Sequence, residues 1–87
     1  LDDWVMSSTK VINLYVEFDR MADVGAFIRF TKEQGFRISD LEMTRANGVG
    51  DNGTAILCTL RLPKKKPHAE ILQMLSEVER VRYVEEL

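Results

Sequence analysis

Several stretches of the chain alternate between apolar and polar residues, which is the period of a β-strand with one buried face. The first is Lys10–Phe18, whose even-numbered side chains are expected to point into the core, and Thr54–Leu62 follows the same pattern. Arg37–Arg45 alternates with a change of phase near Ser39, which predicts a half-exposed strand with a β-bulge. Val81–Leu87 is short enough to be an edge strand.

Two further segments repeat apolar residues at helical spacing. Met21–Gln34 is the first predicted helix, and Gly35 is expected to end it because glycine readily adopts the left-handed conformation. Pro63 is expected to stop the preceding strand, and a second helix is predicted over Pro67–Glu79 because the fixed φ of proline suits a helix start. The segment Ala46–Gly53 holds three glycines and two asparagines, which predicts a hairpin loop.

The predicted order is strand, helix, strand, strand, helix, strand. Right-handed crossovers then place both helices on one face of a four-stranded antiparallel sheet in the spatial order 4-1-3-2. The predicted fold class is therefore α+β, a ferredoxin-like βαββαβ domain. This domain is expected to span residues 10–87, with residues 1–9 as a linker or N-terminal extension.

Length and charge narrow the possible functions. The chain has 87 residues, 45% apolar and 30% charged, and a net charge of −2, so no overall field attracts it to nucleic acid or to an anionic membrane. Its single cysteine excludes an internal disulfide and favours a reducing compartment. No apolar run is long enough for a membrane span. The chain begins at Leu1 rather than at methionine, so we expect it to be part of a longer protein.

The residues that most often carry catalysis are sparse here. Cys58 alternates with apolar residues and is expected to lie in the core, and His68 is expected to be an exposed residue at a helix start. We therefore predict no enzyme activity, and we expect no cofactor. Asp19 and Asp23 are among the carboxylates that suggest a magnesium or calcium site, but either one also suits a cap for the first helix. We predict no metal site.

Two surfaces suggest binding. The cations Arg61, Lys64, Lys65 and Lys66 lie with His68 near the start of the second helix, where phosphate or an anionic lipid headgroup would find free backbone amides. A solvated turn is the alternative.

The second surface is the face of the sheet that no helix covers. Its two central strands place Val11, Tyr15, Ala55 and Leu57 there, which predicts an interface for a homodimer or for another part of the parent protein. Scattered surface residues are the alternative. One tyrosine on these strands does not make a platform for stacking bases, so no nucleic-acid partner is expected.

Three segments carry a resemblance to a known kind of domain. Asp19-Arg20 ends the first strand, Gly35-Phe36-Arg37-Ile38-Ser39-Asp40-Leu41-Glu42 leads into the second, and Val81-Arg82-Tyr83-Val84-Glu85-Glu86-Leu87 closes the chain. Over about residues 10 to 87, this arrangement resembles an ACT-type regulatory domain. The resemblance implies a small-molecule effector, such as an amino acid, bound at the turn between the first strand and the first helix, usually across a dimer interface.

Within that group, the chain looks like the cytosolic C-terminal domain of bacterial MgtC/SapB-family membrane proteins, which are associated with magnesium transport or magnesium stress. The likeness lies in Leu14-Tyr15-Val16-Glu17-Phe18-Asp19-Arg20, in Leu60-Arg61-Leu62-Pro63-Lys64-Lys65 and in Leu75-Ser76-Glu77-Val78-Glu79. It implies a homodimeric regulatory domain on the cytoplasmic side of the cell membrane, in contact with another copy or with its own transmembrane region.

The resemblance also indicates a ligand site. Its residues would be Asp19, Arg20, Asp23 and Gly25 at the first turn. The Pro-Gly pair that usually follows the acidic residue is absent, which favours a non-catalytic regulatory or assembly role over effector binding. A sensor domain for an amino acid, another small effector or magnesium is the alternative.

Overall fold

The computed structural model describes residues 8–46 and 53–87, which form four strands and two helices. The elements are β1 (Ser8–Phe18), α2 (Ala22–Glu33), β2 (Arg37–Arg45), β3 (Thr54–Pro67), α3 (His68–Ser76) and β4 (Val81–Glu86). The predicted βαββαβ order is confirmed. Of the predicted extension at residues 1–9, residues 1–7 lie outside the described residues, and β1 begins two residues before the predicted domain start.

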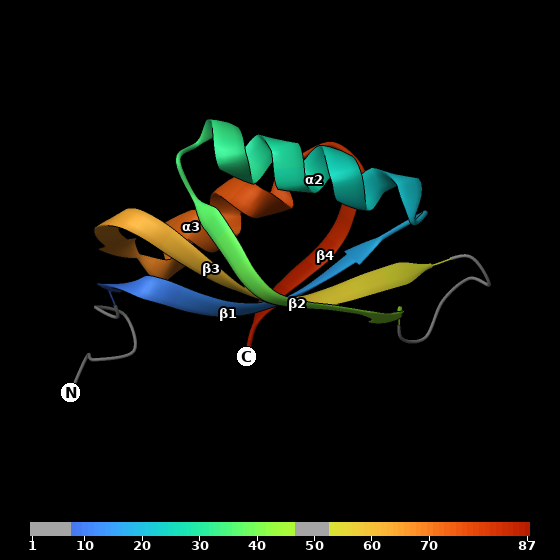
Figure 1. Cartoon of the computed structure of the whole chain (residues 1–87), viewed down its shortest axis with the longest axis horizontal. Helices are drawn as coiled ribbons and strands as arrows, with labels where there is room; N and C mark the ends of the chain where they lie inside the picture. The colour runs from blue at the N-terminus through green and yellow to red at the C-terminus, as the bar shows by residue number, and fades with distance from the viewer. Residues whose placement is uncertain (1–7, 47–52) are drawn as a thin grey trace.

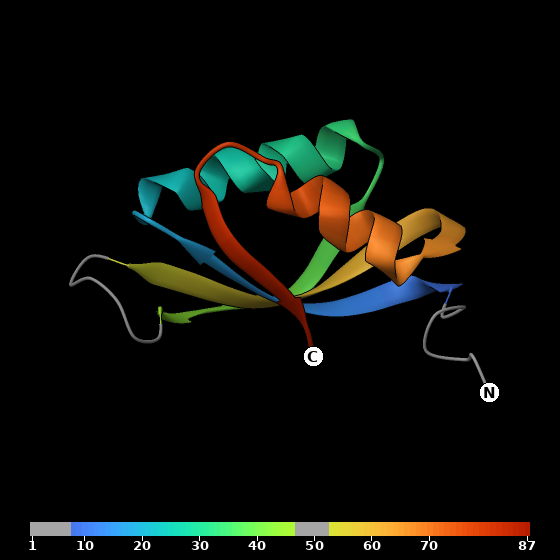
Figure 2. The same ribbon diagram turned by 180° about the vertical axis from the view of Figure 1, so that it is seen from behind.

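The sheet is antiparallel in the order β2-β3-β1-β4, which is the predicted order read from the opposite edge. Both helices lie on the same face of the sheet (Figure 1), and the view from behind shows α3 beside β4 (Figure 2). No described helix or strand covers the other face. The chain therefore has the predicted ferredoxin-like α+β fold.

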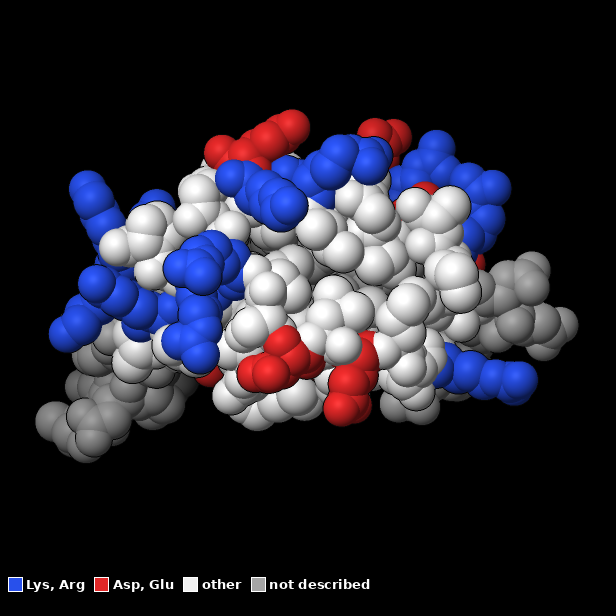
Figure 3. Space-filling model, viewed as in Figure 1, with Lys and Arg blue, Asp and Glu red and all other residues white. Residues whose placement is uncertain are grey.

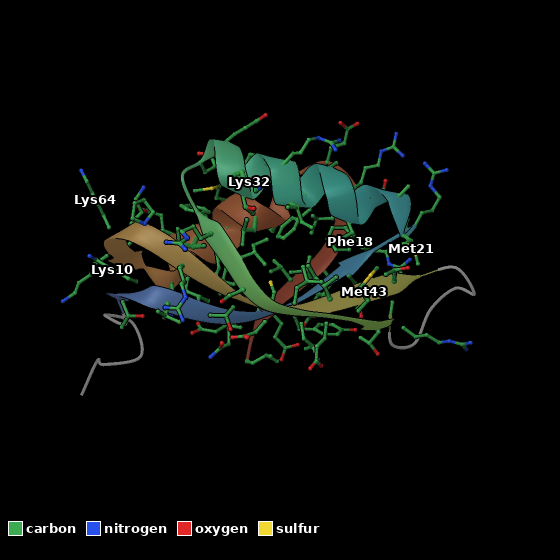
Figure 4. The ribbon with its side chains drawn as sticks, viewed as in Figure 1. Lys10, Phe18, Met21, Lys32, Met43 and Lys64 are labelled. Carbon is green, nitrogen blue, oxygen red and sulfur yellow. The ribbon has the colours of Figure 1, made fainter. Side chains whose placement is uncertain are left out.

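The core lies between the sheet and the helices. On β1, the even-numbered apolar side chains from Ile12 to Phe18 are at most 1% exposed, as the alternation predicts. Phe18, which is labelled in Figure 4, packs against Phe27 of α2 with the rings edge to face and their centroids 5.4 Å apart. The remaining buried apolar residues include Val24, Phe36, Ile56, Cys58, Leu60, Leu62, Ile71 and Leu75.

The predicted bulge in β2 is confirmed. Ser39 pairs with Thr59 and Glu42 pairs with Leu57, so two residues of β2 lie opposite one residue of β3. Asp40, inside the bulge, has a φ of 52°, which is in the left-handed region. The extra residue corrects the phase of the strand, and for this reason Ile38 and Leu41 both pack against the core.

The prediction that Pro63 ends the third strand is wrong, because β3 continues to Pro67. The register moves from Val11 opposite Arg61 to Thr9 opposite Lys66, so the four residues 62–65 of β3 lie opposite Lys10 alone. The register with β2 starts at Arg61. Pro63 therefore lies in a bulge without a register partner, where its missing N–H breaks no ladder hydrogen bond.

The helix ends differ in detail from the predictions. Gly35 follows α2 with a φ of 85°, and the N–H of Phe36 donates to the carbonyl of Thr31, as expected for a glycine C-cap. The predicted capping of α2 by an aspartate is wrong, since Met21 is the N-cap and makes no side-chain cap bond. Pro67 is the N-cap of α3 rather than its first residue, and the helix ends at Ser76 rather than Glu79. Residues 47–52 of the predicted hairpin loop lie outside the described residues.

Candidate functional site

The uncovered side of the sheet, called the open face below, carries charges of opposite sign at its two ends. At one end Arg37 of β2 pairs with Arg61 of β3, which pairs with Val11 of β1. Toward the other end lie Glu42, Glu17 and Glu85. The remaining residues of this face are Ser39, Thr44, Ala55, Leu57, Thr59, Asn13, Tyr15 and Tyr83.

Two tyrosines occupy the acidic end of the open face. Tyr15 and Tyr83 lie edge to face with ring centroids 6.3 Å apart. The hydroxyl of Tyr15 donates to Glu17 at 2.6 Å, and that of Tyr83 donates to Glu85 at 2.9 Å. The bond to Glu85 and its negative charge raise the pKa of Tyr83 above its usual value. Tyr83 is not among the residues predicted for this face, although its alternation with Glu85 places both on one side of β4.

The residues predicted to form an interface have different exposures. Val11 is 38% exposed and Tyr15 and Leu57 are half-buried, so these three contribute accessible apolar surface. Ala55 is fully buried and contributes none, because Glu17 and Thr44 flank it in the same row of the sheet. The interface itself stays a prediction.

The ligand residues predicted at the β1–α2 turn lie beside arginines from the other half of the chain. Asp19 binds Arg82 of β4 at 3.0 Å. Asp23 is buried, and one of its oxygens lies 3.9 Å from a guanidinium nitrogen of Arg80. Each carboxylate is thus partly neutralised within the fold. The pairing joins the end of β1 to β4, which the spacing of residues along the chain does not reveal.

The other two residues of that predicted ligand site are exposed. Arg20 lies in the turn, where its carbonyl accepts a hydrogen bond from the N–H of Asp23. Gly25 lies within α2, and a methyl group added to it would meet the side chain of Arg29 at an ordinary contact distance of 3.8 Å. Packing within the fold therefore does not require a glycine at this position.

The structure separates His68 from the lysines of the predicted anion site. Lys64 and Lys65 are exposed and Lys66 is half-buried in the bulged part of β3. The expectation that His68 is exposed is wrong: it is 7% exposed, its Nδ1 lies 2.7 Å from Glu86, and its Nε2 lies 2.9 Å from the hydroxyl of Thr9. His68 therefore faces the fold and not the lysines.

The contacts of His68 have the order hydroxyl, imidazole, carboxylate that also occurs in nucleophilic triads. Here the hydroxyl of Thr9 lies 2.8 Å from the carbonyl of Val11, which accepts its hydrogen. The three side chains come from β1, α3 and β4, so they tie these elements together. We assign this cluster a structural role.

Cations from three strands meet at a pocket at the basic end of the sheet. This cationic pocket has a volume of about 340 Å³ and is lined by Lys10, Val11, Gly35, Arg37, Arg61, Leu62 and Pro63. Lys and Arg side chains gather at this end in the space-filling view (Figure 3), and Lys10 and Lys64 extend from it in Figure 4. Register brings Arg37 beside Arg61, so sequence spacing alone does not place them together.

An apolar pocket of about 380 Å³ lies next to it, between α2 and β2. Ile28, Phe36, Ile38 and Leu41 line it, and Arg37 lines both pockets.

Cys58 lies in the core, as predicted, with 4% of its surface exposed. Burial raises the pKa of its thiol from 9.0 to about 11. The thiol form is therefore the one that the fold favours. Burial of the neutral thiol therefore contributes to the stability of the fold at low and neutral pH. This contribution is complete at a pH below the pKa of the thiol in the unfolded chain, and it is lost as the pH rises through the folded-state pKa of about 11.

We expect a thiol reagent to label Cys58 at least ~100-fold more slowly in the folded chain than in the denatured chain near neutral pH, because only the thiolate reacts. The measurement is the rate of reagent absorbance change with and without denaturant. The folded-state rate should keep rising with pH beyond 9.0, the ordinary pKa. Equal rates in the two states would contradict the burial of this residue.

No protein-family model matches the chain, and no curated protein matches it. In the described ranges, no helix has the length and apolar character needed to cross a bilayer. Among residues 8–46 and 53–87, no group of three His, Cys, Asp or Glu side chains is placed to hold a metal ion.

Proposed function

We propose that the chain is a non-catalytic regulatory and assembly domain that pairs with a second copy of itself through the open face. The observation that carries this proposal is the separation of charge on that face. Arg37 and Arg61 mark one end, and Glu17, Glu42 and Glu85 lie toward the other. Ser39, Thr59 and Asn13 form the row between the arginines and the first glutamates, and Leu57 and Tyr15 share a row with Glu42 and Glu85.

A two-fold axis that lies between two facing copies, parallel to their sheets, makes these charges complementary. If the axis passes over the gap between β1 and β3, midway between the row of Asn13 and the row of Tyr15, and runs perpendicular to the line from Arg61 to Glu17, it exchanges the two ends of the face. Arg61 of each copy then faces Glu17 of the other copy, and the row of Thr59 faces the row of Tyr15. Opposite charges thus meet twice in one symmetric interface.

The size of the face suits a pair of moderate strength. Four strands about 4.8 Å apart, with the 11 residues of β1 as the longest dimension, give at most about 700 Å² per copy. Stable interfaces bury about 800 Å² per partner. We therefore expect association to depend on concentration.

The place of the domain in a larger protein rests on the resemblance to the cytosolic domains of MgtC/SapB-family proteins. We propose that it acts on the cytoplasmic side of a bacterial membrane protein associated with magnesium transport, where pairing would couple neighbouring copies. A non-catalytic role is supported by the protonated thiol of Cys58 and by the contacts that hold His68.

Charge reversal tests the pairing. Arg61→Glu and Glu17→Arg should each weaken association about tenfold or more, because like charges then meet twice. The double variant should restore it. Sedimentation equilibrium of the 87-residue chain over a wide concentration range measures the effect. Arg29→Glu makes the same charge change on α2, away from the open face, and serves as the control.

If the 87-residue chain without substitutions stays monomeric at every concentration, the proposed pairing is wrong. A double variant no better than the single ones would overturn the proposed axis. If the chain is monomeric and binds instead to membranes that hold the transmembrane part of its parent protein, the open face serves that contact rather than a second copy.

A further inference from the structure

We propose that the cationic pocket binds a phosphate group, either of a soluble phosphorylated molecule or of a lipid headgroup. Lys10, Arg37 and Arg61 come from β1, β2 and β3 and line one cavity of about 340 Å³. This volume accommodates a phosphate with part of the molecule that carries it. The pocket differs from the predicted site at Lys64–Lys66, none of which lines it.

The first step of the argument is the arrangement of like charges. Arg37 and Arg61 are direct cross-strand partners, and a pair of like charges in this position destabilises a sheet. Among residues 8–46 and 53–87, the ion pairs within 4.0 Å involve neither arginine and do not involve Lys10. An anion between these cations would remove the repulsion. Arginine suits phosphate because its planar fork donates two parallel hydrogen bonds.

The second step is the shape of the wall. Gly35 has a φ of 85° and turns the chain from α2 into β2, so that Arg37 follows the last residue of the helix by only four positions. Pro63 lines the pocket beside Gly35, since a methyl group added to Gly35 would contact its ring at 3.7 Å. The bulge in β3 lets Pro63 take this place while Arg61 stays in register. The three cations are thus fixed on strands that the core holds in place.

The excess of positive charge at the cationic pocket contrasts with the net charge of the whole chain. With a net charge of −2, the chain has no general attraction for anions. Binding should therefore depend on the pocket residues themselves, and removing a cation elsewhere should change it little.

Titration of the isotope-labelled chain with inorganic phosphate tests the proposal by NMR. We expect saturable shifts of the Gly35, Arg37 and Arg61 amides with a Kd of about 1 mM. Arg61→Ala and Arg37→Ala should each weaken binding about tenfold. Both side chains are exposed, so both variants should fold, which their spectra will show. Arg29→Ala and Lys65→Ala make the same charge change outside the pocket and should bind as the parent chain does.

A second arm identifies the source of the phosphate. Flotation with phosphatidylglycerol vesicles, compared with phosphatidylcholine vesicles, shows whether a headgroup reaches the pocket, and Arg61→Ala should abolish any such binding. Because Arg61 also faces Glu17 in the proposed pair, the titration is made at a concentration where sedimentation shows a monomer. Its outcome is then independent of the pairing.

Three results would overturn the proposal of a phosphate site. They are shifts that fail to saturate, shifts that chloride reproduces at equal ionic strength, and shifts that Lys65→Ala removes while Arg61→Ala does not.

Discussion

Phe27→Ala is expected to lower the free energy of unfolding by about 3 to 5 kcal/mol, because it removes a large buried ring and leaves a cavity. Phe27 is 1% exposed, and its ring lies edge to face with Phe18 at the centre of the core. A domain is stabilised by about 5 to 15 kcal/mol in total, and one of 87 residues has little surface to bury. The variant should therefore lose most of its stability. Urea unfolding followed by circular dichroism measures the change.

Phe30→Ala is the matched control for this variant. Phe30 lies on the same helix and only partly packs against the core, so its removal should cost about 1 kcal/mol. Both variants make the same chemical change in α2, and helix propensity affects them equally. Equal losses of stability in the two variants would contradict the described orientation of α2 on the sheet.

The side of each strand that faces the core could be predicted from the sequence, because each strand has only one buried side. Alternation alone identifies the inward residues of β1 and of the first part of β3. The bulge in β2 was also predictable, since Ile38 and Leu41 can both reach the core only if an extra residue lies between them. The hand of the crossovers then leaves one order of strands.

Register explains most of what the sequence did not reveal. Pro63 has the same chemistry whether a strand ends there or bulges, and only the pairing of Lys66 with Thr9 shows that β3 continues. The cations of the pocket are likewise far apart along the chain, and cross-strand pairing brings Arg37 beside Arg61. Neighbours in sequence, such as Lys64 to Lys66, do not line this pocket, and anion binding by these lysines stays a prediction.

The burial of His68 is indicated by its spacing from two apolar residues of the same helix. His68 precedes Ile71 and Leu75 at the three- and four-residue steps of one helix face, and all three are buried. The polar character of histidine pointed to solvent. Its two partners, Thr9 and Glu86, lie in β1 and β4, and no pattern local to the helix indicates them.

His68→Ala is expected to lower the free energy of unfolding by about 2 to 3 kcal/mol. The variant loses both side-chain contacts of the ring, one of them to a carboxylate 2.7 Å away, and such charge-assisted bonds are the stronger kind. It also leaves Glu86 without this partner near the end of the chain. Urea unfolding again gives the measurement. Glu79→Ala, an exposed change in the turn before β4, should stay within about 0.5 kcal/mol of the parent chain.

A double-mutant cycle separates this contact from the loss of helix packing. Glu86→Ala removes the carboxylate and leaves the ring of His68 in place, while the double variant removes both. If the two side chains interact as their distance indicates, the double variant should be about 1 to 2 kcal/mol more stable than the sum of the single losses predicts. Strict additivity would mean that the contact with Glu86 does not contribute, and that His68 stabilises the chain through its packing and its contact with Thr9. Because β4 pairs with β1 alone, at the edge of the sheet, the contact between His68 and Glu86 gives that strand a second attachment, to α3. In His68→Ala, hydrogen exchange should therefore accelerate more at the amides of β4 than at the amides of β2, the other edge strand.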